Sequence, residues 1–486
     1  MEGTTFAIMS DTPQQSQSNV PYWKRKNSVK APDNVASVGW VRPKVFFLCR
    51  ENGGAPFVLE SGKKLKDVVI EYETYGSLNP EKSNAILITH ALSGDAHVAG
   101  WDSTANAGYR PWRLKGPGWW DNLVGPGQPF DTNRFFVICA NVIGSCYGST
   151  GPASPNPDAG NRPYGQSFPK VTVGDWVKTQ VALIDYLGIQ QLYAVVGGSL
   201  GGQQALEWAI AYPERVGKCI MLASGGKLPT QGLGFNHVAK VTIHWDPKFN
   251  NGNIYLDSVR EPNTLIDLAR EKDPSLPDLR YYAIKDRYLP SLHSSRMLAH
   301  ITYLSASGME SKFGRKLQMV NSKLTEFAED SENKLELSVH GYLTHQGKSF
   351  VERFDANSYL LIADAMDAYN VQQRWGDGDL VKAMSRIRAE MMVVSFSSDW
   401  LYPSTESHSI VTALLQNHHP VTSVDVTSNC GHDAFLVEEE KVTRIIRSFL
   451  MTPAPAKLRG RGSNGDGTSS KKHGEEKCDC RKGGVK

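Results

Sequence analysis

The sequence has no long hydrophobic run and no strong excess of charge of either sign. None of its 486 residues belongs to an apolar stretch of roughly eighteen residues or more, so no segment is predicted to span a bilayer. Lysine and arginine number 53 against 50 acidic residues, a formal net charge of +3. A charge this small favours neither a nucleic acid nor a membrane surface as the main partner.

A secretory signal and a disulfide framework are also missing. The beginning of the chain is polar and lacks a basic start followed by an apolar stretch, so no signal peptide is predicted. The 7 cysteines are scattered, which indicates reduced thiols and, with the missing signal, a cytoplasmic protein. Cys478 and Cys480, one residue apart, make at most half of a metal site, so no metal is predicted.

What the chain does contain is a series of short apolar runs separated by helical patterns. The runs are Ala85–Thr89, Phe135–Val142, Leu192–Val196, Cys219–Ala223, Met391–Phe396 and Val421–Val426. Continuous apolar runs of this length are typical of buried parallel strands. Their alternation with helices predicts the α/β class, with a mostly parallel sheet covered by helices on both faces.

A long stretch between the early and late runs has few strand-like segments. Helical patterns recur in it, for example at Leu298–Leu304 and Tyr359–Tyr369, so we predict a helical insertion that lies as a lid over the strand ends. The predicted divisions are a disordered N-terminal arm (1–44), the first part of the core (45–225), the lid (226–385), the last part of the core (386–453) and a disordered C-terminal tail (454–486).

One serine stands in a G-x-S-x-G motif. The motif Gly197–Gly201 follows the apolar run Leu192–Val196 and precedes a helical pattern over Gly202–Tyr212. This context is typical of the nucleophile elbow of the α/β-hydrolase fold, a sharp strand-to-helix turn that exposes a serine hydroxyl, here that of Ser199. The alternative is a glycine-rich turn without a chemical role.

A serine hydroxyl becomes a good nucleophile only when a base takes its proton. In the α/β-hydrolase fold the partners follow the serine in the order acid, then histidine. Asp399 comes directly after the run Met391–Phe396, and His432 lies in the loop after the last run. We predict that His432 is the base and that Asp399 orients it. The alternatives are a helix-capping aspartate and a surface histidine.

An oxyanion hole completes such a site. One donor is predicted to be the backbone N–H of Leu200, the residue after the nucleophile, and the other the N–H of Leu92, in the loop after Ala85–Thr89. His90 lies in the same loop but precedes the serine in the chain, so we interpret it as a structural histidine.

Several blocks of sequence resemble the homoserine O-acetyltransferase family, and the resemblance extends from about Val45 to Leu450. The blocks are His90–Gly94, Gly118–Asp121, Asn141–Gly144, Gly148–Pro152, Gly198–Gly202, Arg353–Asn357 and Gly431–Asp433.

The resemblance implies an α/β-hydrolase core with a helical lid and a homodimer formed through that lid. It implies transfer of an acetyl group from acetyl-CoA to the hydroxyl of L-homoserine in methionine biosynthesis, by a ping-pong mechanism through an acyl-serine. It also implies that Asp433 holds the homoserine ammonium group. Acetyl-CoA would be a co-substrate, with no bound cofactor, no nucleic acid and no membrane involved.

The chain departs from the family at one substrate-binding position. The family holds the homoserine carboxylate with an arginine in an Asn-x-x-x-Arg-x-x-Ile-x-x-Asp-Pro pattern, and here Lys240 stands four residues after Asn236. A lysine offers a point charge instead of a planar fork. The hypothesis is that Lys240 holds the acceptor more weakly, or that the acceptor is a different amino alcohol such as serine.

Other functions remain open. Within the same family they are homoserine O-succinyltransferase and serine O-acyltransferase. A serine hydrolase would release the acyl group without an acceptor, and an inactive scaffold would keep the fold alone.

Overall fold

An eight-stranded sheet lies at the centre of this computed structural model, which describes residues 37–105, 110–261, 263–320 and 334–452. In spatial order the strands are β2 (Lys44–Phe47), β5 (Val69–Tyr75), β10 (Phe136–Ala140), β6 (Ala85–Thr89), β13 (Leu192–Gly198), β14 (Val216–Leu222), β19 (Glu390–Phe396) and β20 (Val421–Val426). The strands from β10 to β20 run parallel, while β5 is antiparallel to both β2 and β10. The predicted α/β class is therefore confirmed, and each predicted apolar run forms one of these strands.

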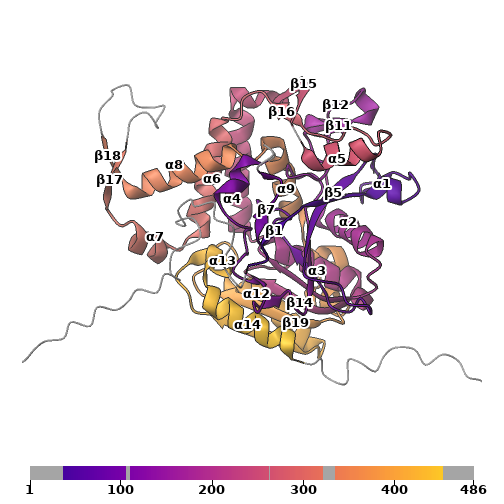
Figure 1. Ribbon diagram of the computed structural model, residues 1–486. Helices are drawn as coiled ribbons and strands as arrows, with labels where there is room; N and C mark the ends of the chain where they lie inside the picture. The colour runs from indigo at the N-terminus through magenta and orange to yellow at the C-terminus, as the bar shows by residue number, and fades with distance from the viewer. Residues whose placement is uncertain (1–36, 106–109, 262, 321–333, 453–486) are drawn as a thin grey trace, which may run out of the picture. The chain divides into compact units, whose positions relative to one another are not determined.

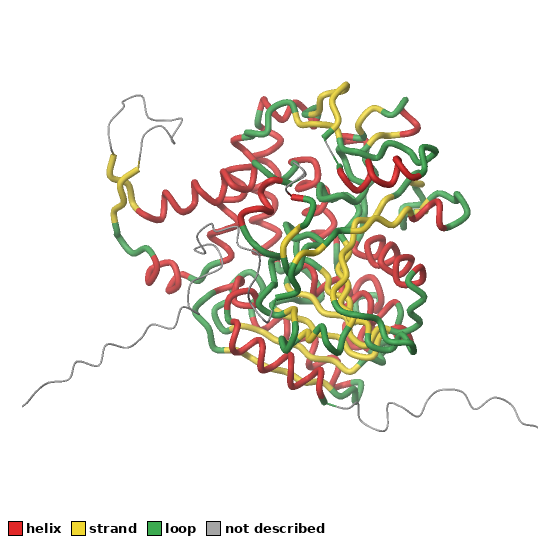
Figure 2. The backbone as a smooth tube through the Cα atoms, in the orientation of Figure 1, coloured by secondary structure: helices red, strands yellow, loops and turns green. Residues whose placement is uncertain are grey.

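Hydrophobic layers cover both faces of the sheet, because alternate residues of a strand point to opposite faces. In β6, Leu87 packs into one layer and Ile88 into the other. The first layer includes helices α2 (Val173–Tyr186), α3 (Leu200–Ala211) and α12 (Ser404–Gln416). The second includes α13 (Ala434–Val437) and α14 (Glu439–Met451), which Figure 1 shows together on one side of the sheet. Figure 2 shows the strands between these helical layers.

The segment between β14 and β19, which we call the insertion, is mainly helical. Its elements are α4 (Thr230–Trp245), β15 (Tyr255–Arg260), α5 (Thr264–Lys272), β16 (Tyr282–Ile284), α6 (Pro290–Tyr303), α7 (Ala306–Lys312), β17 (Leu317–Val320), β18 (Lys334–Leu337), α8 (Ser338–Val351), α9 (Ala356–Ala368), α10 (Val371–Gly376) and α11 (Leu380–Met384). Within it, α6 packs against α4 and α8, and α4 packs against α9. The helical patterns noted in the sequence lie in α6 and α9.

Two antiparallel strand pairs in the insertion were not predicted. They are β15 with β16 and β17 with β18. In β17 the apolar residues Leu317 and Met319 are separated by a glutamine, so the strand has no continuous apolar run in the sequence. Their side chains are 60% and 63% exposed. The remaining short elements are α1 (Leu48–Glu51) and the pairs β1 (Trp40–Val41) with β7 (Trp101–Asp102), β3 (Phe57–Val58) with β4 (Lys64–Leu65), β8 (Val124–Gly125) with β9 (Phe130–Asp131), and β11 (Pro155–Asn156) with β12 (Arg162–Pro163).

The predicted N-terminal arm needs a correction at its end. The arm was expected to run to residue 44, but β1 pairs with β7 in parallel, and Val41 is buried in the second hydrophobic layer. The physical reason is that a two-residue strand beside a loop leaves no periodic pattern in the sequence. The rest of the arm (1–36) and the predicted tail (454–486) lie outside the described residues. None of the described helices is both long and apolar enough to cross a membrane.

Candidate active site

Ser199 lies at a strained turn between β13 and α3. Its backbone has φ 57° and ψ −126°, a conformation that costs a non-glycine residue about 1–3 kcal/mol. Its neighbours must be small, because a Cβ on Gly201 would lie 2.1 Å from the carbonyl oxygen of Thr89. Ser224 donates from Oγ to the carbonyl oxygen of Ser199 over 2.7 Å and so supports the turn. The G-x-S-x-G motif therefore has the sharp geometry predicted for an elbow.

Ser199, His432 and Asp399 form one hydrogen-bonded chain, although 233 residues separate the serine from the histidine. The distance from Ser199 Oγ to His432 Nε2 is 2.8 Å, and that from His432 Nδ1 to Asp399 Oδ2 is also 2.8 Å. The side chains come from the loops after β13, β20 and β19, and all three residues are buried. The arrangement has the reach that a base needs to take a proton from the serine.

The neighbours of the imidazole hold it in place. Asp399 accepts the backbone N–H groups of Leu401 and Tyr402 on Oδ1, both at 2.9 Å, which leaves Oδ2 directed at His432. The ring of Tyr402 stacks on the imidazole at 5.6 Å, and Phe435 meets it edge-on at 5.8 Å. Burial disfavours the imidazolium, but the carboxylate of Asp399 outweighs it and raises the pKa of His432.

The predicted oxyanion donors lie beside the serine. Leu200 is the first residue of α3, so its N–H has no acceptor within the helix. Leu92 lines the same cavity as Ser199. His90 has the structural place expected of it: burial lowers the pKa of its ring, and Nε2 accepts the N–H of Val142 over 3.2 Å. This contact ties the Leu92 loop to the loop after β10.

A buried cluster of ion pairs around Arg113 lies under the same loop and was not predicted from the sequence. Arg113 donates to Asp95 over 2.7 Å and to Asp102 over 2.9 Å, and it is 6% exposed. Asp95 lies only three residues after Leu92, so the ion pairs of Arg113 hold the end of the loop that carries the predicted oxyanion donor. Asp102 and Asp95 precede Arg113 by 11 and 18 residues, and no short motif joins them.

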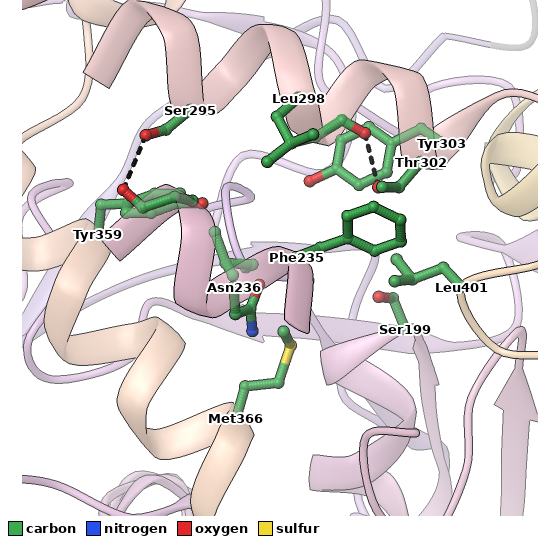
Figure 3. A pocket seen from close by; sticks show the side chains of 13 residues that line it. Ser199, Phe235, Asn236, Ser295, Leu298, Thr302, Tyr303, Tyr359, Met366 and Leu401 are labelled. Carbon is green, nitrogen blue, oxygen red and sulfur yellow. Dashed lines mark hydrogen bonds between the residues drawn. The ribbon is translucent and has the colours of Figure 1, made fainter. Parts of the chain in front are cut away.

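A cavity opens above Ser199, under the insertion. Its lining consists of Leu92, Ser199, Phe235, Asn236, Ala239, Ser295, Leu298, Ala299, Thr302, Tyr303, Tyr359, Met366 and Leu401. Most of these residues belong to α4, α6 and α9, and Figure 3 shows Phe235 and Leu401 next to the serine. The insertion thus covers the serine with a largely apolar surface.

Lys240 is not among the residues that line this cavity. Its Nζ donates to Asp364 over 2.8 Å and to Asp367 over 2.7 Å, and Asn236 donates to the other oxygen of Asp367. Burial lowers the pKa of Lys240, but these hydrogen bonds outweigh it and raise the pKa above its ordinary value. The structure therefore ties Lys240 to carboxylates of α9 and does not bring it to the serine.

Asp433 follows His432 directly in a 3₁₀ turn, Gly431–Asp433. Burial raises the pKa of its carboxyl group to about 6, while His432, Arg296 and Lys312 act in the opposite direction. Arg296 was not predicted as a site residue, because it lies in a helical segment that carries no recognisable motif. It donates to the Oγ of Ser93 over 3.2 Å, next to the Leu92 position.

No group of three or more His, Cys, Asp or Glu residues that could hold a metal ion occurs among the described residues. The absence of a metal remains a prediction.

The comparisons with known proteins agree with this geometry. A family model described as alpha/beta hydrolase fold matches residues 84–439. A homoserine O-acetyltransferase of Methanohalobium evestigatum is 43% identical over 414 residues, 85% of this chain and 74% of its own. A homoserine O-succinyltransferase of Neisseria meningitidis is 45% identical over 416 residues, 85% of this chain and 97% of its own.

Solved structures give the same picture. A homoserine O-acetyltransferase from Bacillus anthracis superposes with a TM-score of 0.68 at 26% identity, covering 85% of this chain and 99% of that one. An esterase named E22 superposes with a TM-score of 0.65 at 29% identity, covering 84% and 100%. The predicted α/β-hydrolase fold is confirmed.

Proposed function

The chain belongs to the homoserine O-acyltransferase family of the α/β-hydrolase fold, and from this premise we propose that it moves an acyl group from acyl-CoA to L-homoserine. The observation that carries the proposal is the hydrogen-bonded chain from Ser199 through His432 to Asp399. It lies beneath an insertion that leaves Ser199 only 8% exposed.

In the first half-reaction Ser199 Oγ attacks the thioester carbonyl carbon of the donor. Nε2 of His432 takes the hydroxyl proton, and Asp399 stabilises the imidazolium that forms. The carbonyl oxygen becomes an oxyanion that the N–H groups of Leu92 and Leu200 bind. The C–S bond then breaks, the proton passes from His432 to the departing sulfur, and CoA leaves as a thiol.

The second half-reaction reverses these roles with a different nucleophile. His432 takes the proton of the homoserine hydroxyl, whose oxygen attacks the acyl-serine carbonyl carbon. The ester bond to Ser199 breaks, and His432 returns the proton to Ser199 Oγ. The product is O-acyl-homoserine. Transfer competes with hydrolysis, and the largely apolar cavity favours transfer because it limits the access of water.

We propose acetyl-CoA as the donor, with succinyl-CoA as an equal rival. A relative named as an acetyltransferase and relatives named as succinyltransferases are 43% to 45% identical to the chain over the same extent. The acceptor is proposed as L-homoserine, with its ammonium group on Asp433, and L-serine is the alternative.

A serine hydrolase is the second candidate, and a specific observation favours it: the esterase E22 superposes over its whole length. The two functions share the acyl-serine and differ only in what attacks it. An inactive scaffold is opposed by the intact chain of hydrogen bonds, since a site without chemistry has no need for all three side chains.

We also propose that two copies of the chain pair through the insertion. The support is an exposed apolar surface on β17 and β18, where Leu317, Met319 and Leu335 are 60%, 63% and 58% exposed. Figure 1 shows this hairpin at the outer edge of the insertion. Apolar side chains gathered this way on one element mark an interaction surface.

The function is tested by following thiol release from acetyl-CoA and from succinyl-CoA, each with and without L-homoserine. The proposal expects sustained release from one donor only when homoserine is present, and no release by a Ser199→Ala variant. Equal release without any acceptor would instead establish a hydrolase. If neither donor reacts with homoserine or serine present, the proposed function is refuted.

A further inference from the structure

Lys240 and Arg296, two cationic side chains of the insertion, differ in their partners. Lys240 already contacts two carboxylates, Asp364 and Asp367, so its cluster carries one net negative charge. Arg296 forms no ion pair with any carboxylate in the part of the chain that the structure describes, and its hydrogen bonds go to the neutral hydroxyl groups of Ser93 and Tyr303. A substrate carboxylate is therefore repelled by the first cluster and attracted by the second.

The position of Arg296 is close to the reacting groups. It belongs to the face of α6 that also carries Ala299 and Tyr303, two residues of the cavity lining. Its guanidinium lies 5.4 Å from the ring centroid of Tyr303, and that ring lies 6.0 Å from the imidazole of His432. One aromatic ring therefore separates Arg296 from the proposed base.

Arg296 also contacts the loop that carries the proposed oxyanion donor Leu92. Its Nη1 donates to Ser93 over 3.2 Å, and Ser93 follows Leu92 directly. Phe350 of α8 covers the guanidinium at 4.7 Å. These contacts leave the planar fork of the guanidinium with donors to spare, since an arginine has five N–H groups.

We propose that Arg296 binds the α-carboxylate of the acceptor amino acid while Asp433 binds its α-ammonium group. This inference rests on the proposed function and names the residue that replaces Lys240 in acceptor recognition. Arg296 and Asp433 interact electrostatically but do not form a direct ion pair, so a zwitterion that bridged them would satisfy both charges. The hydroxyl at the far end of such an acceptor then reaches His432, which adjoins Asp433.

The chemistry of the fork fits a carboxylate. A guanidinium donates two parallel hydrogen bonds to a carboxylate, and such bonds are stronger than neutral ones. The distal carboxylate of a succinyl donor has the same chemistry. The charges of Arg296 and Asp433 favour the acceptor over the donor as the ligand of Arg296. A zwitterionic acceptor pairs with both residues, whereas the carboxylate of a succinyl donor pairs with the arginine alone.

The test pairs two variants with two truncated acceptors. The compound 4-hydroxybutanoate is homoserine without its ammonium group, and 3-aminopropan-1-ol is homoserine without its carboxylate. Arg296→Gln is expected to raise KM about tenfold or more for homoserine and for 4-hydroxybutanoate, and to leave KM for 3-aminopropan-1-ol unchanged. Asp433→Asn is expected to show the reverse pattern for the two truncated acceptors. Arg296→Lys is expected to recover part of the loss for homoserine.

Three results would overturn the proposal. An equal KM rise for all three acceptors with Arg296→Gln would mean a structural role only. A slower single-turnover thiol release from succinyl-CoA, with KM for homoserine unchanged, would assign the arginine to the donor. A larger KM rise for homoserine in Lys240→Gln than in Arg296→Gln would return the carboxylate to Lys240.

A binding measurement separates this proposal from the proposed function. Calorimetric titration of L-homoserine into Ser199→Ala, with and without Arg296→Gln, needs no turnover. Loss of binding with Arg296→Gln supports the carboxylate site even if the wild-type chain transfers no acyl group. Undiminished binding refutes the site even if the transferase activity is present.

Discussion

At the scale of single residues, the site depends on groups whose charge is set by their neighbours. Asp399 accepts hydrogen bonds from two backbone N–H groups and from Nδ1 of His432. Burial lowers the pKa of this imidazole, but the carboxylate outweighs burial, raises the pKa and favours the charged form during proton transfer. Asp433, one residue further, has a pKa raised by burial to about 6. It is therefore mostly a carboxylate at neutral pH and loses its charge in mild acid.

This titration predicts a pH dependence of acceptor recognition. As the pH falls through about 6, Asp433 becomes protonated and can no longer pair with an ammonium group, so KM for L-homoserine is expected to rise. The measurement is kcat/KM for homoserine divided by that for 4-hydroxybutanoate, between pH 5 and pH 8. The ratio cancels the titration of His432, and a ratio independent of pH would contradict the account.

The residue scale also shows what the sequence could not predict. The strand–turn–helix context of Ser199 is local, so its motif could be recognised. Lys240 could not be placed, because its partners Asp364 and Asp367 follow 124 and 127 residues later. Arg296 likewise meets Ser93 across 203 residues. Only the packing of the helices around the cavity determines that Lys240 is paired with carboxylates and that Arg296 is not.

At the scale of elements, the elbow requires that β6, β13 and α3 approach closely. Thr89 of β6 donates from Oγ1 to the carbonyl oxygens of Val196 and Gly201, at 3.1 and 2.8 Å. The backbone at Gly201 therefore lies against β6 without room for a side chain. The long apolar strands could be predicted from the sequence, whereas β17 and β18 are short and exposed and left no apolar run.

The close approach predicts opposite effects for two glycine substitutions. Gly201→Ala places a methyl group 2.1 Å from a backbone oxygen, so it is expected to destabilise the fold by about 1–3 kcal/mol or more. Gly234→Ala, in the exposed part of α4, meets no atom within 4 Å and is expected to stabilise by up to about 1 kcal/mol. Thermal unfolding of both variants checks this, and shifts of Tm in the same direction would argue against the described packing.

At the scale of the whole molecule, the insertion provides most of the cavity lining, and the sheet provides the serine. The core loops and the insertion also contact each other directly: Trp400, next to Asp399, donates from Nε1 to the carbonyl oxygen of Leu304 over 2.9 Å. The loop of the acid is thus coupled to the end of α6. A cytoplasmic location and a homodimer stay predictions at this scale.

The proposed homodimer predicts that charge on the exposed hairpin separates the copies. Met319→Glu places a carboxylate on a side chain that is 63% exposed, and it is expected to convert a dimer to a monomer. Leu415→Glu on α12, where the leucine is 57% exposed, is the matched control and is expected to leave the dimer intact. Sedimentation velocity distinguishes them. A monomeric wild-type protein, or equal dissociation of both variants, would contradict the proposed interface.

The most direct test of the central claim is to trap the acyl-enzyme. The protein is mixed with acetyl-CoA or succinyl-CoA without acceptor, quenched, and measured by intact and peptide mass spectrometry. We predict one acyl group on Ser199 with the accepted donor, its removal within one turnover when L-homoserine is added, and none in Ser199→Ala. Formation of O-acyl-homoserine without any acyl group on Ser199 would contradict the account, because transfer would then not pass through the serine.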